Sequence, residues 1–315
     1  MTYATWPIPS LEGRSGKIIA LFSLTVVVFF FLHLVSLMEV HTSIGPLKIT
    51  VSFCSDLFEF SKCLSLFEAG TKGNEYFIET RTVESLSVPS DAKNRRDHYF
   101  VEHSLYDLCF GNQHFSLRIN LAQKSAVLTV VSDFKDKGLL LFNAFKWFLS
   151  LITIDNGGIP VHCSNMIRIN KALLFIGKSG SGKSTISNLL SIDRQSWQKG
   201  SDELNLIFKQ DSAVYAYATP YLSFDSDLRT SGASVEHLFF LNHSSHNFVS
   251  DFPKKNIYWN ILKNIYTIPA NESLAEKMYY NVELISESVK CSDLFFINNQ
   301  SVKQFIEEWM DNQDV

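Results

Sequence analysis

The residues with the clearest chemistry form a glycine-rich stretch that follows a short apolar run and precedes an expected helix. From Gly177 to Ser184 the chain reads G-K-S-G-S-G-K-S, which is the spacing G-x-x-x-x-G-K-[ST] of a phosphate-binding loop. Glycines let backbone N–H groups point inward, and the helix start adds the positive end of its dipole, so the stretch predicts an anion cradle. Its expected members are Gly177, Lys178, Ser179, Gly180, Ser181, Gly182, Lys183, Ser184 and Thr185.

Two side chains of this cradle indicate a nucleoside triphosphate and a metal. Lys183 is expected to reach the β- and γ-phosphates, and the hydroxyl of Ser184 to complete the shell of a Mg²⁺ ion. The metal also needs a carboxylate, and the acidic pair Asp202-Glu203 is the first candidate downstream. They precede the apolar run Leu204–Phe208, so they begin an expected strand, whereas the acid of common Walker B motifs ends one. We therefore expect ATP and Mg²⁺ as cofactors.

A histidine before the loop completes the set of candidate residues. Two expected strands, Ile159–Ile169 and Ala172–Ile176, are joined by a tight reversal that we predict at Asn170-Lys171. With the reversal centred there, the antiparallel register sets His162 near Ser179, at the mouth of the loop. A lone histidine is as often a core or surface residue, so a catalytic role for His162 depends on this register.

The elements that must position these residues belong to an α/β chain. Upstream of a break at 155–158, the apolar pattern predicts strands and one apolar helix, at Leu47–Phe53, Tyr76–Thr80, Phe115–Asn120, Ala126–Val131 and, for the helix, Lys137–Ile154. Downstream, we expect strands at Leu204–Phe208, Ala213–Ala218 and Val235–Leu241, and helices at Thr185–Leu190, Pro253–Tyr266 and Val302–Met310. Lys146 interrupts the apolar helix. His243 and His246 fall in a polar turn, and neither is assigned to a metal.

Composition excludes several classes of protein. The 315 residues are 46% hydrophobic and 19% charged, which is typical of a chain that builds one large or two modest domains. The net charge of −4 gives no reason to expect nucleic acid as a partner. The five cysteines are scattered and show no C-x-x-C spacing, so neither a zinc site nor a disulfide framework is expected. We predict a mixed sheet with packed helices at 157–315, a smaller β-rich α+β lobe at 45–156 and an apolar segment at 1–40.

The N-terminal segment allows three interpretations. Ile18–Met38 carries no formal charge and is long enough to span a bilayer as a helix. It is a membrane anchor, a helix buried on the protein, or an extension upstream of a domain that begins at Met38. Arg14 and Lys17 before it and Glu39 after it weakly favour a cytoplasmic N-terminus, which would place the rest of the chain outside, away from ATP. We expect the loop-bearing domain in the cytoplasm, tethered to the inner face of a membrane if the segment is an anchor.

The chain resembles the HPr-kinase-like branch of the P-loop kinases, the group that also contains phosphoenolpyruvate carboxykinase. The resemblance covers about Ile159–Leu241 and depends on short stretches in the same order. These are V-H-C-S at Val161–Ser164, the loop at Gly177–Ser184, S-D-E at Ser201–Glu203, A-T-P-Y at Ala218–Tyr221 and V-E-H-L-F-F-L at Val235–Leu241. The resemblance implies a P-loop kinase fold of the HPr-kinase/carboxykinase type. It also implies proton handling and phosphate positioning for His162 and Asp202, and metal binding for Glu203 and Ser184.

One departure from that family bears on the substrate. HPr kinase/phosphorylases carry an E-x-R-G-x-G stretch after the acids, which is tied to their protein substrate and to the reverse reaction. Here the only arginine in that region is Arg229, in S-D-L-R-T-S-G. HPr itself is therefore not the expected substrate, and whether the reverse dephosphorylation occurs stays open.

The predicted function is transfer of the γ-phosphoryl group of ATP to a hydroxyl, first of all a serine of a small protein or peptide. A small-molecule kinase or a carboxykinase-like enzyme would use the same loop and acids. A non-catalytic, membrane-tethered ATP sensor would bind the nucleotide and form no product. No LSGGQ follows the loop and no N-K-x-D motif occurs, which argues against an ABC ATPase and a GTPase. The acceptor and the oligomeric state stay open.

Overall fold

The computed structural model describes residues 38–53, 73–87, 100–104, 107–133, 135, 137–192, 196–219, 232–267, 269 and 271–312. The chain divides into two compact units, Met1–Met38 and Glu39–Val315, and the elements below belong to the second, although the first strand starts at Met38. The apolar segment Ile18–Met38 lies outside the described residues except for Met38, so its three interpretations remain predictions. Within the described part of the chain, no helix combines the length and apolarity needed to cross a bilayer.

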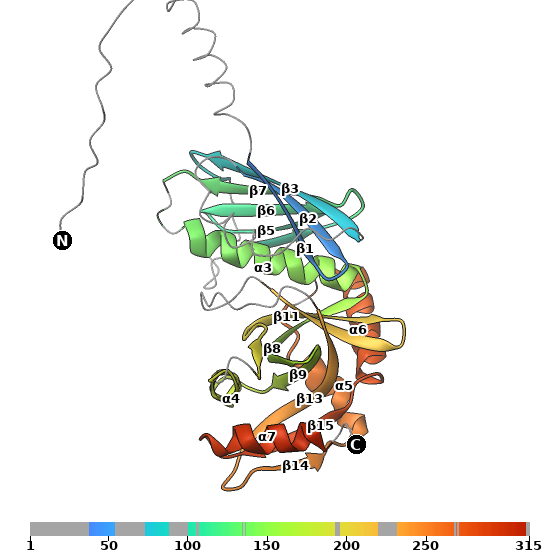
Figure 1. Ribbon diagram of the computed structural model, residues 1–315. Helices are drawn as coiled ribbons and strands as arrows, with labels where there is room; N and C mark the ends of the chain where they lie inside the picture. Colours follow the sequence, from blue (N-terminus) through green and yellow to red (C-terminus); the bar gives the residue numbers. More distant parts are fainter. Residues whose placement is uncertain are drawn as a thin grey trace, which may run out of the picture. The chain divides into compact units, whose positions relative to one another are not determined.

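The fold is α/β and contains two mixed sheets, of which the N-terminal one is followed by the first described helix (Figure 1). The first sheet has the strand order β1-β2-β3-β7-β6-β5-β4. Its strands are β1 (Met38–Ile44), β2 (Leu47–Phe53), β3 (Asn74–Val83), β4 (Phe100–His103), β5 (Asp107–Gly111), β6 (Phe115–Asn120) and β7 (Ser125–Val131). β3 runs parallel to both β2 and β7, and β7, β6, β5 and β4 form an antiparallel meander. The four strands predicted for this region are confirmed, with β3 longer than expected.

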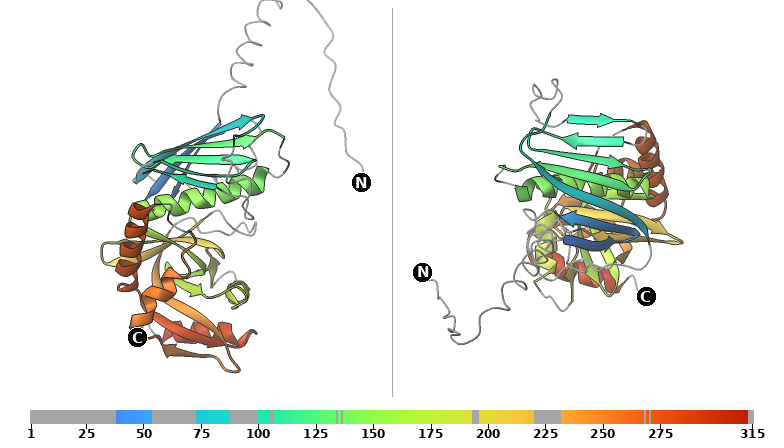
Figure 2. Two further views of the ribbon diagram at one scale, coloured as in Figure 1. Left: turned by 180° about the vertical axis from the view of Figure 1, so that it is seen from behind. Right: turned by 90° about the horizontal axis from the view of Figure 1, so that it is seen from above.

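Helix α3 (Lys137–Asp155) confirms the predicted apolar helix and packs against both sheets. Figures 1 and 2 show it between the first sheet and the strands of the second. Phe148 and Ile152 on this helix are fully buried, in one continuous hydrophobic core that includes Ile49 of β2 and Val161 of the second sheet. This shared core fixes α3 relative to the strands that carry the phosphate-binding loop.

The candidate site residues lie either on a strand of the second sheet or in a segment that directly follows one of its strands. Its strands are β8 (Gly158–Arg168), β9 (Lys171–Ile176), β10 (Gln198–Lys199), β11 (Leu204–Gln210), β12 (Ala213–Ala218), β13 (Ala233–His243), β14 (Phe248–Asp251) and β15 (Cys291–Phe296). The order is β10-β8-β11-β12-β13-β15-β14, and β9 pairs with both β8 and β13. The pairings among β8, β9, β13, β12 and β11 therefore close into a ring. β13 is parallel to β9 and β15, so these three strands end at the same edge.

The hairpin between β8 and β9 corrects the predicted reversal. The turn residues are Ile169 and Asn170, both with positive φ (47° and 65°), and Cys163 lies opposite Ile176. The prediction of Asn170-Lys171 was wrong because Lys171 is an extended residue of β9. Asparagine tolerates the left-handed conformation, and the side chain of Ile169 is held in solvent, so the two-residue turn forms one position earlier.

Four further helices lie in the part of the chain that the structure describes. They are α4 (Lys183–Leu190), α5 (Lys254–Leu262), α6 (Glu272–Ser286) and α7 (Ser301–Asp311). α5 is shorter than predicted because the residues after it bond to β8: the amide of Tyr266 donates to the carbonyl of Pro160. α6 and β15 were missing from the prediction. Asn271, whose side chain accepts a bond from the amide of Leu274, caps the start of α6.

Candidate functional site

The phosphate-binding loop joins β9 to α4, and its glycines are required by local geometry. Gly180 and Gly182 have φ of 79° and 96°, in the region that favours glycine. A Cβ on Gly177 would lie 2.3 Å from Oγ of Ser181, and a Cβ on Gly182 would lie 2.6 Å from Cζ of Phe296. The loop therefore has no room for a side chain at Gly177 and Gly182, whereas Gly180 is favoured by its backbone conformation alone.

Lys183, the first residue of α4, lies across this loop. Its Nζ donates to the carbonyl oxygens of Gly177 at 2.7 Å and of Lys178 at 3.2 Å. The residue is buried, and this burial lowers the pKa of its ammonium group. The loop thus encloses a cation as well as the start of a helix, two features that favour an anion.

Asp202 is held by one contact from β10 and one from α4. Its Oδ2 lies 2.5 Å from Nζ of Lys199, and its Oδ1 accepts a bond of 2.8 Å from the hydroxyl of Ser187. Oγ of Ser187 is also 3.1 Å from the carbonyl oxygen of Ser184. The buried hydroxyl of Ser187 therefore holds Asp202 beside α4, and its longer contact is with the backbone of Ser184, not with the hydroxyl predicted to bind the metal.

Glu203 contacts a different part of the chain. Its Oε2 pairs with Nζ of Lys146 on α3. Lys146 also lies over the rings of Phe142 and Tyr266, at 4.8 Å and 5.4 Å from their centroids. Lys146 was not among the predicted site residues, although a single cation in an apolar helix was the signal that could have found it.

His162 lies on β8 between the loop and the acids. Its backbone pairs with Leu204, the residue after Glu203, and its amide donates to the carbonyl of Asn264. Since Cys163 pairs with Ile176, His162 is level with Gly177 and not with Ser179 as predicted. Burial, helped by the charge of Lys183, lowers the pKa of its half-buried imidazole. The ring is therefore neutral near pH 7 and can accept a proton.

A cavity of about 470 Å³ brings most of the candidate residues together. The lining includes His162, Ser179, Gly180, Gly182, Lys183, Ser184, Thr185, Asp202 and Glu203. Gly177, Lys178 and Ser181 do not line it: the first two supply the carbonyls that hold Lys183, and the hydroxyl of Ser181 is buried.

Two lining residues, His243 and Asn298, were not predicted. Nε2 of His243 lies 3.2 Å from the carbonyl oxygen of Gly180. His243 ends β13 and Asn298 follows β15, and both strands run parallel to β9. Their side chains reach the loop because parallel strands present their carboxyl ends at one edge. These two residues could be found only once the pairing of β13 with β9 and β15 was known.

The residues of this cavity fit a magnesium nucleotide. Within the described ranges, no three His, Cys, Asp or Glu side chains gather into a metal site of their own. Mg²⁺ typically takes one or two carboxylates, keeps several waters and shares phosphate oxygens. Ser184, Asp202 and Glu203 at one end of a phosphate-binding loop match that donor set.

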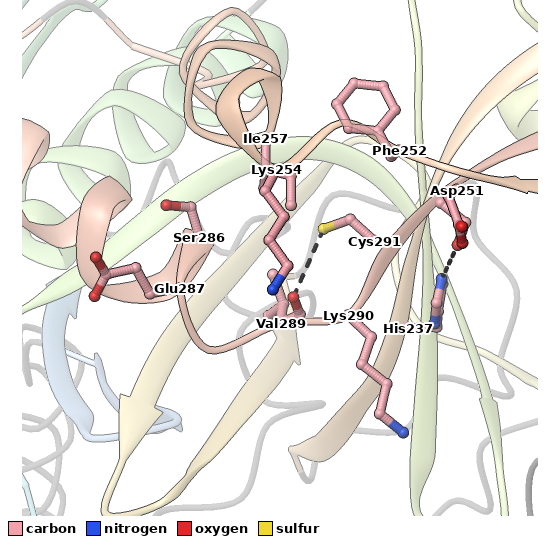
Figure 3. Close-up of a pocket in the computed structure, with 11 residues that line it drawn as sticks. His237, Asp251, Phe252, Lys254, Ile257, Ser286, Glu287, Val289, Lys290 and Cys291 are labelled. Atoms are coloured by element: carbon pink, nitrogen blue, oxygen red, sulfur yellow. Dashed lines mark hydrogen bonds between the residues drawn. The ribbon is translucent and has the colours of Figure 1, made fainter.

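A second cavity, of about 810 Å³, lies where β14, α5, α6 and β15 meet (Figure 3). His237 of β13 contributes a wall, with Nε2 at 3.0 Å from the hydroxyl of Ser292. Burial lowers the pKa of His237 to about 4, so the ring is neutral. Lys254, Lys290 and Cys291 also line this cavity, but none of the predicted site residues does. The candidate site is therefore the cavity at the phosphate-binding loop.

Comparisons with known proteins add a distant structural similarity. No protein family model matches this chain, and no curated protein matches its sequence. Among solved structures, the HPr(Ser) kinase/phosphatase from Coxiella burnetii is similar at 14% identity and a TM-score of 0.29, covering 49% of this chain and 95% of that chain. A similarity this distant says nothing about activity, so the function proposed below depends on the site itself.

Proposed function

We propose that this chain is an ATP-dependent kinase of the HPr-kinase-like type, which transfers the γ-phosphoryl group to a hydroxyl. The first acceptor class is a serine of a small protein or peptide. The observation that carries the proposal is that one cavity collects Lys183, Ser184, Asp202, Glu203 and His162. A phosphate-binding loop alone supports nucleotide binding, whereas two acids and a neutral histidine beside it support phosphoryl transfer.

The loop and the acids would hold ATP and Mg²⁺. When bound, they supply the phosphoryl group and the charge that neutralises it. The backbone N–H groups of the loop and the ammonium of Lys183 bind phosphate oxygens. Ser184, Asp202 and Glu203 provide the oxygen ligands for the metal. Positioning and charge neutralisation are expected to supply most of the rate, as in other phosphoryl transfers.

Asp202 is the proposed proton acceptor for the acceptor hydroxyl. Its carboxylate is oriented by Ser187 and by Lys199, each bonded to a different oxygen. Each oxygen keeps a second lone pair, so the carboxylate can still accept a hydrogen bond from the acceptor. His162, neutral because of its lowered pKa, supports this step as a hydrogen-bond partner.

The identity of the phosphoryl acceptor distinguishes a protein or peptide kinase from a small-molecule kinase or a carboxykinase-like enzyme. A small-molecule kinase or a carboxykinase-like enzyme would need an enclosed pocket near Thr219–Arg229, and 220–231 lies outside the described residues. The experiment is to incubate the purified full-length protein with [γ-³²P]ATP, Mg²⁺, serine-containing peptides, a metabolite panel and a lysate from its own source. Label on a protein or peptide supports the proposal, and label on a metabolite replaces it with a small-molecule kinase.

A Lys183→Ala variant serves as the control for this experiment. It is expected to lose transfer and to bind ATP more weakly, because the ammonium that meets the phosphates is gone. Label that persists in this variant comes from a contaminating kinase. Nucleotide binding by the wild type with no labelled product from any acceptor would instead make the chain a non-catalytic ATP sensor.

A further inference from the structure

Lys146 reaches the candidate site from outside the segment that carries the phosphate-binding loop. It lies on α3, and its Nζ pairs with Oε2 of Glu203 at the cavity wall. The two partners differ in environment: the side chain of Lys146 is 7% exposed and that of Glu203 is 53% exposed. The cation is therefore part of the core, and the carboxylate faces the cavity.

Aromatic rings fix the position of this buried cation. Phe142 lies one turn earlier on α3, and Tyr266 belongs to the segment that bonds to β8 next to His162. Both rings lie within the range of cation–π attraction for Nζ of Lys146. α3 itself is anchored in the shared core by residues such as Phe148, which is fully buried. The ammonium group thus occupies a place that the fold determines.

We propose that Lys146 is a positioning residue for the metal of the candidate site, which it serves by anchoring one carboxylate oxygen of Glu203. The inference depends on the proposed function, because it concerns the Mg²⁺ that accompanies ATP. A carboxylate has two oxygens, and Lys146 engages Oε2. The other oxygen remains for a metal or its water shell, with the side chain held at one place.

Burial argues for anchoring and against competition between Lys146 and the metal. A buried ammonium left without its partner is strongly unfavourable, so Lys146 does not release Glu203 when a metal arrives. An exposed glutamate without such a partner would sample several rotamers and lose that freedom on binding. Because Lys146 already holds the side chain of Glu203 in one place, little further side-chain entropy is lost when the metal binds. The elements before the loop thereby take part in the site.

The experiment measures how much Mg²⁺ the full-length protein needs in order to bind AMP-PNP, an ATP analogue that is not hydrolysed. Calorimetric titrations are run over a range of Mg²⁺ concentrations on the wild type, Lys146→Met and Lys146→Arg. We expect Lys146→Met to raise the Mg²⁺ midpoint about tenfold, as for loss of an outer-shell partner of a metal ligand. AMP-PNP affinity without Mg²⁺ should change less than about twofold. Lys146→Arg keeps a cation that can bond the Glu203 carboxylate, so it should raise the midpoint less than Lys146→Met does.

Two controls separate positioning from folding. Lys277→Met removes a lysine that pairs with Asp155 of α3 at 2.6 Å, away from the cavity, and should leave the Mg²⁺ midpoint unchanged. In a Glu203→Gln background, Lys146→Met should add no further shift, since it acts through Glu203. If Lys146→Met does not fold, Lys146→Gln replaces it, with an expected shift of about threefold because a donor remains.

The outcomes distinguish this inference from the proposed function. If the wild type binds no AMP-PNP with or without Mg²⁺, the proposed function fails. If the wild type binds with Mg²⁺ but the midpoint in the folded Lys146 variant is unchanged, Lys146 is purely structural and the inference is overturned. A lower midpoint in that variant would also overturn it, because Lys146 would then compete with the metal.

Discussion

Leu204 of β11 lies directly opposite His162 of β8 in an antiparallel ladder. Because Asp202 and Glu203 immediately precede Leu204, this pairing brings both acids beside the histidine. On its other edge β8 pairs with β9, which leads into the phosphate-binding loop. One strand therefore joins the three motifs that the sequence separates, and the cavity at this point contains side chains from all of them.

The tight packing at Gly182 predicts a specific loss of stability and binding. Gly182→Ala places a Cβ in a left-handed residue and 2.6 Å from the ring of Phe296, so strain and a clash add. Gly157→Ala is the matched control, since Gly157 has φ of 85° but no atom within 4 Å of the added Cβ. The control should lose about 1–2 kcal/mol of unfolding free energy, and Gly182→Ala clearly more, as measured by urea denaturation.

Nucleotide affinity gives a second measurement on these two variants. Gly182→Ala should weaken AMP-PNP binding at least about tenfold because the start of α4 must shift. Gly157→Ala should bind as the wild type does. Equal affinities in both variants would mean that the backbone at Gly182 does not form part of the binding surface.

Loss of the Ser187 hydroxyl is expected to slow catalysis, although we do not expect this hydroxyl to contact the substrate. Ser187→Ala removes the 2.8 Å bond to Asp202 and leaves the part-buried carboxylate oxygen with one partner fewer, a change that costs about 1–3 kcal/mol. Turnover should therefore fall about tenfold or more, and ATP affinity without Mg²⁺ should stay within about twofold of wild type. Ser191→Ala, at the exposed end of the same helix, is the control and should be neutral. Equal turnover in the two variants would show that Ser187 does not orient Asp202 for catalysis.

Much of the local structure could be predicted because its determinants are local. The alternation in Leu47–Phe53, the glycines of the loop and the apolar stripe of Val302–Met310 each reflect a period or a turn requirement within one segment. The fold class follows from their order. The hairpin turn was misplaced by one residue because Asn170 tolerates the turn conformation at either position, and the neighbouring strands decide between them.

The rest of the site could not be predicted because it depends on contacts between distant segments. His243 and Asn298 reach the loop only through the parallel pairing of β13 with β9 and β15. Lys146 reaches Glu203 only because α3 packs on β8 and β11. A single cation in an apolar helix shows that Lys146 needs a partner, but nothing near it, or near His243 and Asn298, indicates which distant segment they meet. α6 was missed although Asn271, the residue that caps its start, is a local signal.

Buried His237 predicts how stability depends on pH. Its pKa is lowered to about 4 in the folded state, whereas an unfolded histidine titrates near 6.5. Below about 6.5 the unfolded state binds a proton that the folded state does not, so stability falls as pH decreases from about 6.5 to about 4. The loss reaches roughly 3 kcal/mol at the lower end.

The variant that tests this prediction is His237→Gln, because its amide can still reach the hydroxyl of Ser292. Chemical denaturation between pH 7.5 and 4.5 should show a shallower loss of unfolding free energy in the variant than in the wild type. Parallel curves for the two proteins would show that the acid sensitivity originates elsewhere.

The measurement that tests the central claim most directly is the rate of ³²P transfer from [γ-³²P]ATP by Asp202→Asn, with ATP affinity measured on the same preparation. If the acids beside the phosphate-binding loop take part in phosphoryl transfer, the variant binds ATP within about threefold of wild type and transfers label at least about 100-fold more slowly. Transfer at the wild-type rate with unchanged binding would contradict the assignment of Asp202 and, with it, the kinase mechanism proposed for this cavity.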